Sequence, residues 1–226
     1  MKILIGIPAY NEAQTIGDVI TSLPKRIKGV AKIDILVVSD GSTDNTEYIS
    51  DKKGALVISH LLNRGLGGAL KTIFEYTRHS NYDILVTCDA DGQHLGSDVL
   101  KVIESLLKNN KDVVIGVREY NTKNSPKSKI IINHIANFLT YLLCGIYTHD
   151  SQSGLRAFNK KAIKLINTQT DGMEVSSEIF KEIKNNNLTY GEIPIKAIYT
   201  DYSKMKGQRL GDAPDVLFRL ILRMIK

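Results

Sequence analysis

The sequence predicts an α/β fold in which helices cover both faces of a mostly parallel sheet. Short runs rich in Val, Ile and Leu alternate with helical patterns through the first half of the 226 residues, and this order is typical of such folds. The runs are apolar throughout instead of alternating polar and apolar residues, as expected of strands that are buried on both faces. Both observations favour one domain built on a parallel sheet.

Each element is predicted from its own pattern. Apolar runs predict strands at 2–8, 33–39, 55–59, 84–88, 112–117 and 190–197. Apolar residues at intervals of three and four predict helices at 11–23, 65–78, 97–107, 130–147, 160–166 and 174–185. Pro24 ends the first helix, and residues 41–44 have the composition of a turn with a helix cap.

The domain is predicted to span residues 1–212, followed by an amphipathic, basic helix at 213–226. In that helix, Arg219, Arg223 and Lys226 share one face. Two polar stretches, 119–129 and 199–212, are predicted to be loops. Cys88 and Cys144 give neither a disulfide framework nor a zinc spacing, so they are interpreted as buried thiols of a cytoplasmic protein.

Residues 130–147 are almost long enough to cross a bilayer. However, Asn133, Asn137 and Thr140 recur at helical spacing, with Ile131 and Phe138 on the opposite side, so the segment is predicted to be amphipathic. With a net charge of +6, this helix and the terminal one could lie peripherally on an anionic membrane. The alternatives are packing on the domain and a contact within a homo-oligomer. The sequence shows no nucleic-acid module, and nucleic acid is excluded as a partner.

Polar side chains follow three of the predicted strands, where parallel sheets bind their ligands. Asp89 and Asp91 come directly after the strand at 84–88, with Gln93 and His94 close behind. Carboxylate oxygens one residue apart can approach one hard cation, and Mg²⁺ or Mn²⁺ usually shares such ligands with phosphates. A metal site is therefore predicted at Asp89 and Asp91, to which Gln93 and His94 could add a ligand or a hydrogen bond.

Five motifs then occur in an order that resembles the family-two glycosyltransferases, which have the GT-A fold. The last of them resembles the subgroup that contains dolichyl-phosphate mannose synthase and other polyprenyl-phosphate glycosyltransferases. The motifs are Ile-Pro-Ala-Tyr-Asn-Glu at 7–12, Val-Val-Ser-Asp-Gly-Ser-Thr-Asp at 37–44, Asn-Arg-Gly-Leu-Gly-Gly-Ala at 63–69, Asp-Ala-Asp-Gly-Gln-His at 89–94 and Asp-Ser-Gln-Ser-Gly-Leu-Arg-Ala-Phe at 150–158. The resemblance covers about residues 1–210.

The resemblance implies a site for a nucleotide-sugar donor, carried by UDP or GDP. Its donor-binding residues would be Pro8, Ala9, Tyr10, Glu12, Asp40, Ser42, Gly67, Asp89, Ala90 and Lys206. Alternatives from the residues themselves stay open. Tyr10 could be a packing residue, Asp40 a turn cap, and Gly65, Gly67 and Gly68 could serve turn geometry alone.

The resemblance implies that Asp89, Asp91 and Gln93 hold the metal. It also implies an inverting transfer by single displacement, with this metal and cations offsetting the charge on the leaving diphosphate. Asp91, Arg118 and Arg156 are the predicted catalytic residues, and the arginines would face an anionic acceptor. Lys204, Lys206 and Arg209 could add positive charge from their loop. A polyprenyl phosphate, already ionised, would need these cations and no general base.

Other functions stay open. A hydroxyl of a saccharide, lipid or small metabolite could be the acceptor, with Glu174 as base. However, relatives that use hydroxyls often have a Glu-Asp pair where this chain has Met173-Glu174. Many relatives also carry arginine where Lys127 and Lys129 stand, and lysine lacks the bidentate fork. A sugar nucleotidyltransferase would need a glycine-rich, cationic loop in place of residues 8–12, and a non-catalytic nucleotide-sugar-binding module would not need Asp89 and Asp91.

Overall fold

The computed structural model describes residues 1–119, 127–196 and 198. Its strands form one sheet in the order β3-β2-β1-β4-β6-β5-β7. The strands are β1 (Lys2–Ala9), β2 (Lys32–Asp40), β3 (Leu56–His60), β4 (Ile84–Thr87), β5 (Val113–Glu119), β6 (Arg156–Asn159) and β7 (Tyr190–Lys196). The helices are α1 (Ile16–Ser22), α2 (Thr46–Lys52), α3 (Leu66–His79), α4 (Gly96–Asn109), α5 (Lys127–Cys144), α6 (Lys160–Leu165) and α7 (Val175–Asn185).

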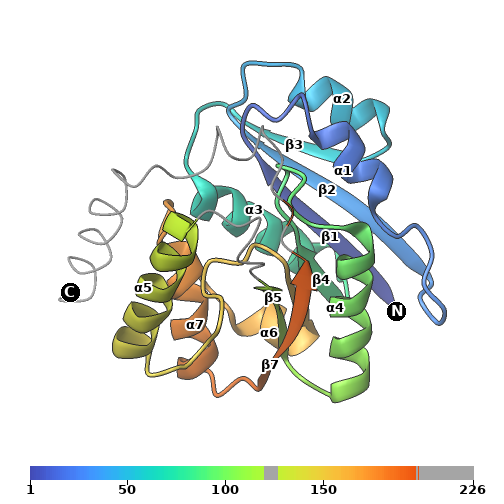
Figure 1. Ribbon diagram of the computed structural model, residues 1–226. Helices are drawn as coiled ribbons and strands as arrows, with labels where there is room; N and C mark the ends of the chain where they lie inside the picture. Colours follow the sequence, from blue (N-terminus) through green and yellow to red (C-terminus); the bar gives the residue numbers. More distant parts are fainter. Residues whose placement is uncertain (120–126, 197, 199–226) are drawn as a thin grey trace.

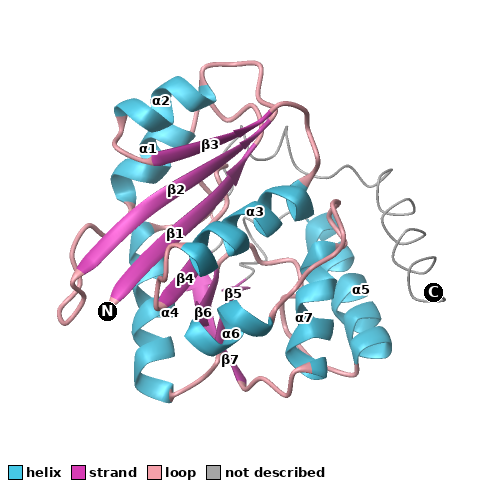
Figure 2. Cartoon of the chain, turned by 180° about the vertical axis from the view of Figure 1, so that it is seen from behind, coloured by secondary structure: helices cyan, strands magenta, loops and turns pink. Residues whose placement is uncertain are grey.

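Helices cover both faces of this sheet, as the sequence predicts (Figures 1 and 2). Ile3, Ile5 and Ile7 of β1 face a core shared with α1 and α4. Leu4 of the same strand faces a second core, formed with α3, α6 and α7. Gly6 has no side chain on that second face, and a Cβ there would lie 2.4 Å from Ile73 of α3. The glycine therefore allows α3 to lie close against the centre of the sheet.

The strand β6 is the exception to the parallel arrangement, since it runs antiparallel to both β4 and β5. The sequence pattern assigned no element to this segment. The chain reaches β6 from a loop at the carboxyl edge of the sheet, so it can only run away from that edge. As a result Arg156, the first residue of β6, pairs with Thr87, the last residue of β4. The antiparallel direction thus brings a cation to the edge where β4 ends.

The first helix begins five residues later than predicted, at Ile16. Asn11 has a left-handed backbone with a φ of 53°, which interrupts helical geometry. The loop it forms is tied to the loop after β2: Thr43 N donates to Asn11 Oδ1 at 2.8 Å, and Ala13 N donates to Asp44 Oδ2 at 3.0 Å. The loop after β1 and the loop after β2 are therefore fixed to each other. The apolar pattern at 11–23, which predicted a helix, did not indicate this contact.

The cysteines, the predicted loops and the terminal helix are described only in part. Cys88 is buried and Cys144 is half-buried, and burial raises the pKa of the Cys88 thiol. The predicted loop at 119–129 is shortened by α5, which begins at Lys127. The loop at 199–212 and the helix at 213–226 lie outside the described residues. In the part of the chain that the structure describes, no helix has the length and apolarity needed to cross a membrane.

Asp112, at the amino end of β5, joins several segments and should make stability depend on pH. Although burial opposes its ionisation, hydrogen bonds from Thr189 N, Asn159 Nδ2, Lys161 Nζ and the Thr189 hydroxyl lower its pKa to about 2. The difference from the ordinary value of 3.8 corresponds to about 2 kcal/mol.

We therefore expect Asp112→Asn to destabilise the protein by about 2 kcal/mol at neutral pH. Because the folded pKa is depressed, the contribution is complete above pH 4 and is lost as the pH falls toward 2. Denaturant titrations between pH 7 and pH 3 test this, with the exposed Asp51→Asn as control. A constant difference between variant and wild type at all pH values would contradict it.

Candidate functional site

A cavity of about 440 Å³ opens at the carboxyl ends of β1, β2 and β4. It lies where the sequence predicts a site, at the edge that gathers the polar strand ends. The predicted residues that line it are Pro8, Ala9, Tyr10, Glu12, Asp40, Gly65, Asp89, Ala90, Asp91 and Arg156. Residues from all five sequence motifs therefore line one cavity, although some are more than a hundred positions apart.

Asp89 and Asp91 both line this cavity, and their carboxyl groups influence each other. Burial, and then the charge of Asp89, raises the pKa of Asp91. Burial also opposes ionisation of Asp89, but the hydrogen bond from His94 and the charges of His94, Arg118 and Arg156 lower its pKa. Two carboxylates that repel each other in this way are a suitable setting for a divalent cation, which would relieve the repulsion.

The donor set of this pair fits Mg²⁺ or Mn²⁺, which prefer oxygen ligands. Within residues 1–119, 127–196 and 198, no three His, Cys, Asp or Glu side chains form a complete metal site. Asp89 and Asp91 would therefore hold the ion together with water and phosphate oxygens, as such ions usually require. The third predicted ligand, Gln93, does not line the cavity; its Nε2 donates to Asp91 Oδ2 at 2.5 Å and its N to Asp91 Oδ1 at 3.0 Å.

His94 orients the first carboxylate. Its side chain is 2% exposed, and its Nε2 lies 3.2 Å from Asp89 Oδ2. Its Nδ1 has no hydrogen-bond partner among the described residues. The sequence placed His94 close enough for a hydrogen bond, and the structure shows that bond to Asp89.

Gly154 gives Asp89 its space. A Cβ at this position would lie 2.1 Å from Asp89 Oδ1. Thr87 Oγ1 donates to Gly154 O at 2.8 Å, so the glycine backbone is fixed beside the end of β4. The side chain of Asp89 can rotate and the backbone cannot, so a larger residue here would displace the carboxylate.

We expect Gly154→Ala to lower the rate of a reaction that depends on the Asp89 carboxylate about 10- to 100-fold, with a small effect on folding. The φ of Gly154 is not in the left-handed region, so alanine is compatible with its backbone. Steady-state rates and thermal unfolding measure the two effects. Gly191→Ala is a matched control, because its Cβ would meet only Lys111 Cγ at an ordinary 3.5 Å. Normal activity in Gly154→Ala would show that Asp89 need not occupy this position.

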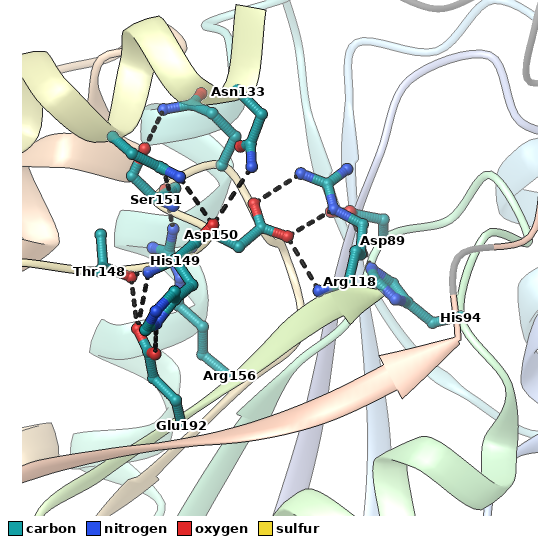
Figure 3. Close-up of polar contacts among 12 residues, drawn as sticks. Asp89, His94, Arg118, Asn133, Thr148, His149, Asp150, Ser151, Arg156 and Glu192 are labelled. Atoms are coloured by element: carbon teal, nitrogen blue, oxygen red, sulfur yellow. Dashed lines mark hydrogen bonds and ion pairs between the residues drawn. The ribbon is translucent and has the colours of Figure 1, made fainter. Parts of the chain in front are cut away.

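Arg118 is held by a buried carboxylate. Its Nε donates to Asp150 Oδ2 at 2.7 Å, its Nη2 donates to Oδ1 at 2.8 Å, and its backbone N also donates to Oδ2 at 3.1 Å (Figure 3). The Asp150 side chain is fully buried and that of Arg118 is 17% exposed. Arg118 is not among the residues that line the cavity, but its charge lowers the pKa of Asp89. Sequence reasoning chose Arg118 and missed Asp150, although Asp150 begins the fifth motif.

Arg156 lines the cavity from the start of β6. It is 2% exposed, donates from Nη2 to Ser151 O at 2.8 Å, and lies 5.5 Å from the ring centroid of Phe180. Burial lowers its pKa to about 10, while Asp150 and Asp89 act in the opposite direction. The guanidinium is therefore charged at neutral pH. Its Nε is buried and has no hydrogen-bond partner among the described residues.

Asp40 lines the cavity and also caps the loop after β3. Its Oδ1 lies 2.6 Å from His60 Nδ1 and accepts from Arg64 N at 3.0 Å, and its Oδ2 accepts from Gly65 N at 2.7 Å. The capping alternative placed these bonds in the Asp-Gly-Ser turn that Asp40 begins, whereas the structure has them in a loop 24 and 25 residues further along the chain. A contact with a donor would have to coexist with these bonds.

The glycines at the start of α3 pack against the protein's own backbone. Gly67 N and Gly68 N donate to Asp171 O at 2.8 and 3.3 Å. A Cβ at Gly67 would lie 2.0 Å from Thr170 O. Gly67 does not line the cavity, whereas Gly65, with a φ of 92°, does. The close approach that these glycines permit is therefore to the loop at 170–172.

The last two predicted donor-binding residues are Ser42 and Lys206. Ser42 does not line the cavity; its Oγ accepts from Asn11 N at 3.1 Å and supports the first loop. Lys206 lies outside the described residues, as do Lys204 and Arg209. The cavity also includes residues that were not predicted, namely Asn63, Leu66, Ala69, Leu70, Thr87, Gln152, Ser153, Gly154, Met173 and Ser176. Many of them belong to the quoted motifs, which could have indicated them, whereas no pattern marked Met173 or Ser176.

The comparison with known proteins agrees with this geometry. A family model described as glycosyl transferase family 2 matches residues 4–166. The chain belongs to this family. It is a family 2 glycosyltransferase, and the resemblance stated from its motifs is confirmed.

Relatives extend the similarity over almost the whole chain. An uncharacterised protein of Methanocaldococcus jannaschii is 42% identical, with 99% of this chain and 93% of that protein covered. The UDP-N-acetylglucosamine–dolichyl-phosphate N-acetylglucosaminyltransferase of Methanococcus voltae is 37% identical, with 96% and 93% covered.

A solved structure shares the fold of this glycosyltransferase. Glucosyl-3-phosphoglycerate synthase of Mycobacterium tuberculosis, in complex with Mn²⁺, UDP and glucosyl-3-phosphoglycerate, matches with a TM-score of 0.74 at 20% identity. The match covers 97% of this chain and 77% of that one. The GT-A fold class predicted from the sequence is thereby confirmed.

Proposed function

We propose that this glycosyltransferase moves a sugar from a nucleoside diphosphate sugar to a polyprenyl phosphate, with Mg²⁺ or Mn²⁺ held by Asp89 and Asp91. One observation carries the proposal. Asp89, Asp91 and the buried Arg156 line one cavity, and the charges of Arg118 and Arg156 both lower the pKa of Asp89. The carboxylates suit a metal diphosphate, and the guanidiniums suit a second anion.

The donor side follows from charge. When the bond from the anomeric carbon to the diphosphate breaks, negative charge grows on the leaving group. A divalent ion, when bound, neutralises that charge as a Lewis acid. Asp89 and Asp91 would hold this ion at the end of β4, and the cavity beside them is lined by Pro8, Ala9, Tyr10, Glu12 and Asp40. His94 keeps Asp89 in position.

The acceptor side follows from the arginines. A phosphate monoester is ionised near neutral pH, so its attack needs positive charge and no general base. Arg156 offers a buried cation with an unpartnered Nε, and Asp150 fixes Arg118 in one orientation. We expect attack on the face opposite the leaving group, with inversion. The Methanococcus voltae relative, which is named for transfer to dolichyl phosphate, supports this acceptor class.

A polyprenyl phosphate lies in a bilayer with its phosphate at the surface. The enzyme is therefore proposed to work peripherally, at the cytoplasmic face of a membrane.

The direct test combines candidate donors with Mn²⁺ and a short-chain polyprenyl phosphate. UDP- and GDP-sugars are first screened by thermal shift, since a ligand that binds the folded state raises the unfolding midpoint. Those that bind are then assayed for a glycosylated phospholipid by mass spectrometry. We expect a polyprenyl-phosphate sugar and free nucleoside diphosphate. Transfer only to hydroxyl acceptors, or release of pyrophosphate from a nucleoside triphosphate, would refute the proposal.

Glu174→Gln separates the two acceptor classes. Glu174 precedes α7, and its Oε2 would lie 2.3 Å from a Cβ at Gly172. Unlike its neighbours Met173 and Ser176, it does not line the cavity. We therefore expect Glu174→Gln to change transfer to a phosphate acceptor by less than about threefold, whereas loss of a general base would cost about 100-fold or more. Parallel assays with a phosphate and a saccharide acceptor measure the difference.

A further inference from the structure

The helix α5 turns its polar side toward the protein. Asn133 Nδ2 and Asn137 Nδ2 both donate to His149 O, at 3.3 and 2.6 Å, and Thr140 Oγ1 lies 3.1 Å from Ser177 Oγ in α7. Asn133 and Thr140 are 4% and 0% exposed. A surface helix normally buries its apolar side, so this helix has the reverse orientation. Its buried amides and hydroxyl have partners, and the arrangement is therefore a stable one.

The apolar side of α5 consequently faces outward. Ile131, Ile135, Phe138 and Leu142 are 50% to 65% exposed and follow one another at intervals of four, three and four residues. Tyr141 lies at the edge of this row and is also exposed. We call these five residues the α5 stripe. It extends over about 17 Å of helix, and an uninterrupted row of large apolar side chains of this kind marks an interaction surface.

Figures 1 and 2 place α5 at the outer edge of the described structure, with α7 beside it.

The charges around the α5 stripe are positive. The sequence of the helix, 127–144, contains no Asp or Glu. On the neighbouring α7, Lys181 and Lys184 are exposed. Lys184 Nζ donates to Gly145 O at 3.3 Å. Burial raises the pKa of Cys144, and the nearby charge of Lys181 partly opposes that rise. Both lysines thus lie at the carboxyl end of α5.

The acidic side chains of α7 are directed to another loop. Glu178 accepts from Gln169 N and Thr170 N at 2.8 and 2.9 Å, and Glu182 accepts from Asn167 N at 3.1 Å. Within the described part of the chain, Lys181 and Lys184 form no ion pair. An apolar row beside such lysines complements an anionic phospholipid surface. A neutral protein groove would not require the lysines.

The inner side of α5 is attached to the loop that orients the arginines. Asn137 Oδ1 accepts from Ser151 N at 2.8 Å, next to Asp150, which binds Arg118 (Figure 3). The same loop accepts the Arg156 guanidinium at Ser151 O. The α5 stripe and the loop that orients the arginines therefore lie on opposite sides of one helix, which is about 10 Å across. A lipid phosphate at the surface of a bilayer that contacts the stripe would have little distance to cover.

We propose that the α5 stripe docks on an anionic bilayer and presents the arginine site to lipid phosphates in it. The choice of a bilayer over a protein partner rests on the proposed polyprenyl phosphate acceptor. The row of apolar side chains inserts among the acyl chains just below the headgroups, while Lys181 and Lys184 contact anionic headgroups. The helix lies flat on the membrane and does not cross it.

Flotation with vesicles tests the surface separately from the reaction. The full chain is mixed with vesicles of phosphatidylcholine and phosphatidylglycerol that contain no acceptor. We expect wild type to bind them, and Phe138→Asp to lower the partition coefficient at least about tenfold. Tyr48→Asp is the matched control: Tyr48 is 63% exposed and Phe138 62%, and Tyr48 lies on α2, away from α5. The double variant Lys181→Ala/Lys184→Ala should bind vesicles that contain phosphatidylglycerol at least about tenfold less tightly than wild type. On vesicles without phosphatidylglycerol, this variant and wild type should bind alike.

Transfer to a short-chain, water-soluble polyprenyl phosphate controls for folding. Phe138→Asp should keep this activity, because Phe138 does not contact the arginines. If neither wild type nor any variant transfers sugar to that acceptor, but Phe138→Asp binds vesicles more weakly than wild type, the proposed function fails and the docking surface stands. The docking proposal is overturned if wild type does not bind vesicles, or if Phe138→Asp and Tyr48→Asp bind equally. It is also overturned if Phe138→Asp converts a dimer to a monomer in sedimentation analysis and leaves vesicle binding unchanged.

Discussion

Asp91→Asn should lower the rate of sugar transfer by about 10²- to 10³-fold while leaving the protein folded. Asparagine has the same size as aspartate but lacks the negative charge that holds a divalent ion opposite Asp89. Burial and the charge of Asp89 raise the pKa of Asp91, so the ionised carboxylate is unfavourable in the folded protein without metal. The variant should therefore unfold at the same or a higher temperature than wild type in metal-free buffer.

Two measurements separate this outcome from simple damage. The rise in unfolding midpoint that Mn²⁺ and a nucleoside diphosphate give together in wild type should disappear in Asp91→Asn. Asp51→Asn, an exposed change on α2, should keep both the rise and the activity. Retention of a metal-dependent midpoint shift by Asp91→Asn would remove the carboxylate pair from the proposed mechanism.

Asp150→Ala should both destabilise the fold and disable the acceptor site. It removes the bidentate partner of Arg118, so a mostly buried guanidinium loses two charge-assisted hydrogen bonds. Breaking a pair of this kind costs about 3–5 kcal/mol, which for a chain of this size is a fall of ~10 °C in the unfolding midpoint. Loss of orientation at Arg118 should lower the rate about 100-fold.

Calorimetry and steady-state assays at a temperature where the variant is folded check both effects. Asp150→Asn keeps an acceptor oxygen and should fall between Asp150→Ala and wild type. Asp171→Ala breaks the exposed pair with Arg64, whose atoms lie 3.8 Å apart, and should cost under about 1 kcal/mol. If Asp150→Ala had the same kcat as wild type, the proposed role of Arg118 at the acceptor would be refuted.

Most of the donor side was predictable from sequence. The apolar runs at 2–8, 33–39 and 84–88 identified β1, β2 and β4, and the rule that parallel strands end at one edge placed their polar ends together. Asp89 and Asp91 needed nothing more, since they follow β4 directly. The contacts of Gln93 and Gly67 were less predictable. Gln93 N donates to Asp91 Oδ1 and Gly67 N donates to Asp171 O, and hydrophobic periodicity does not indicate such bonds.

The acceptor side depended on contacts between distant segments. Arg118 and Asp150 are 32 residues apart, and no local pattern indicates that they pair. The direction of β6 was equally hidden, since a four-residue strand is too short to show its orientation. The sequence revealed that α5 has a polar and an apolar side, but not which of them faces the protein.

By itself the sequence determined the described strands except β6 and the described helices except α2, together with the family and the carboxylates at the end of β4. These follow from local periodicity and from the geometry of parallel sheets, which act over a few residues or one repeating unit. The tertiary structure alone decided that β6 brings Arg156 to that edge, that Asp150 binds Arg118, and that α5 faces outward with its apolar side. Each of these depends on whether a polar group finds a buried partner in a distant segment, and that is settled only when the chain is folded.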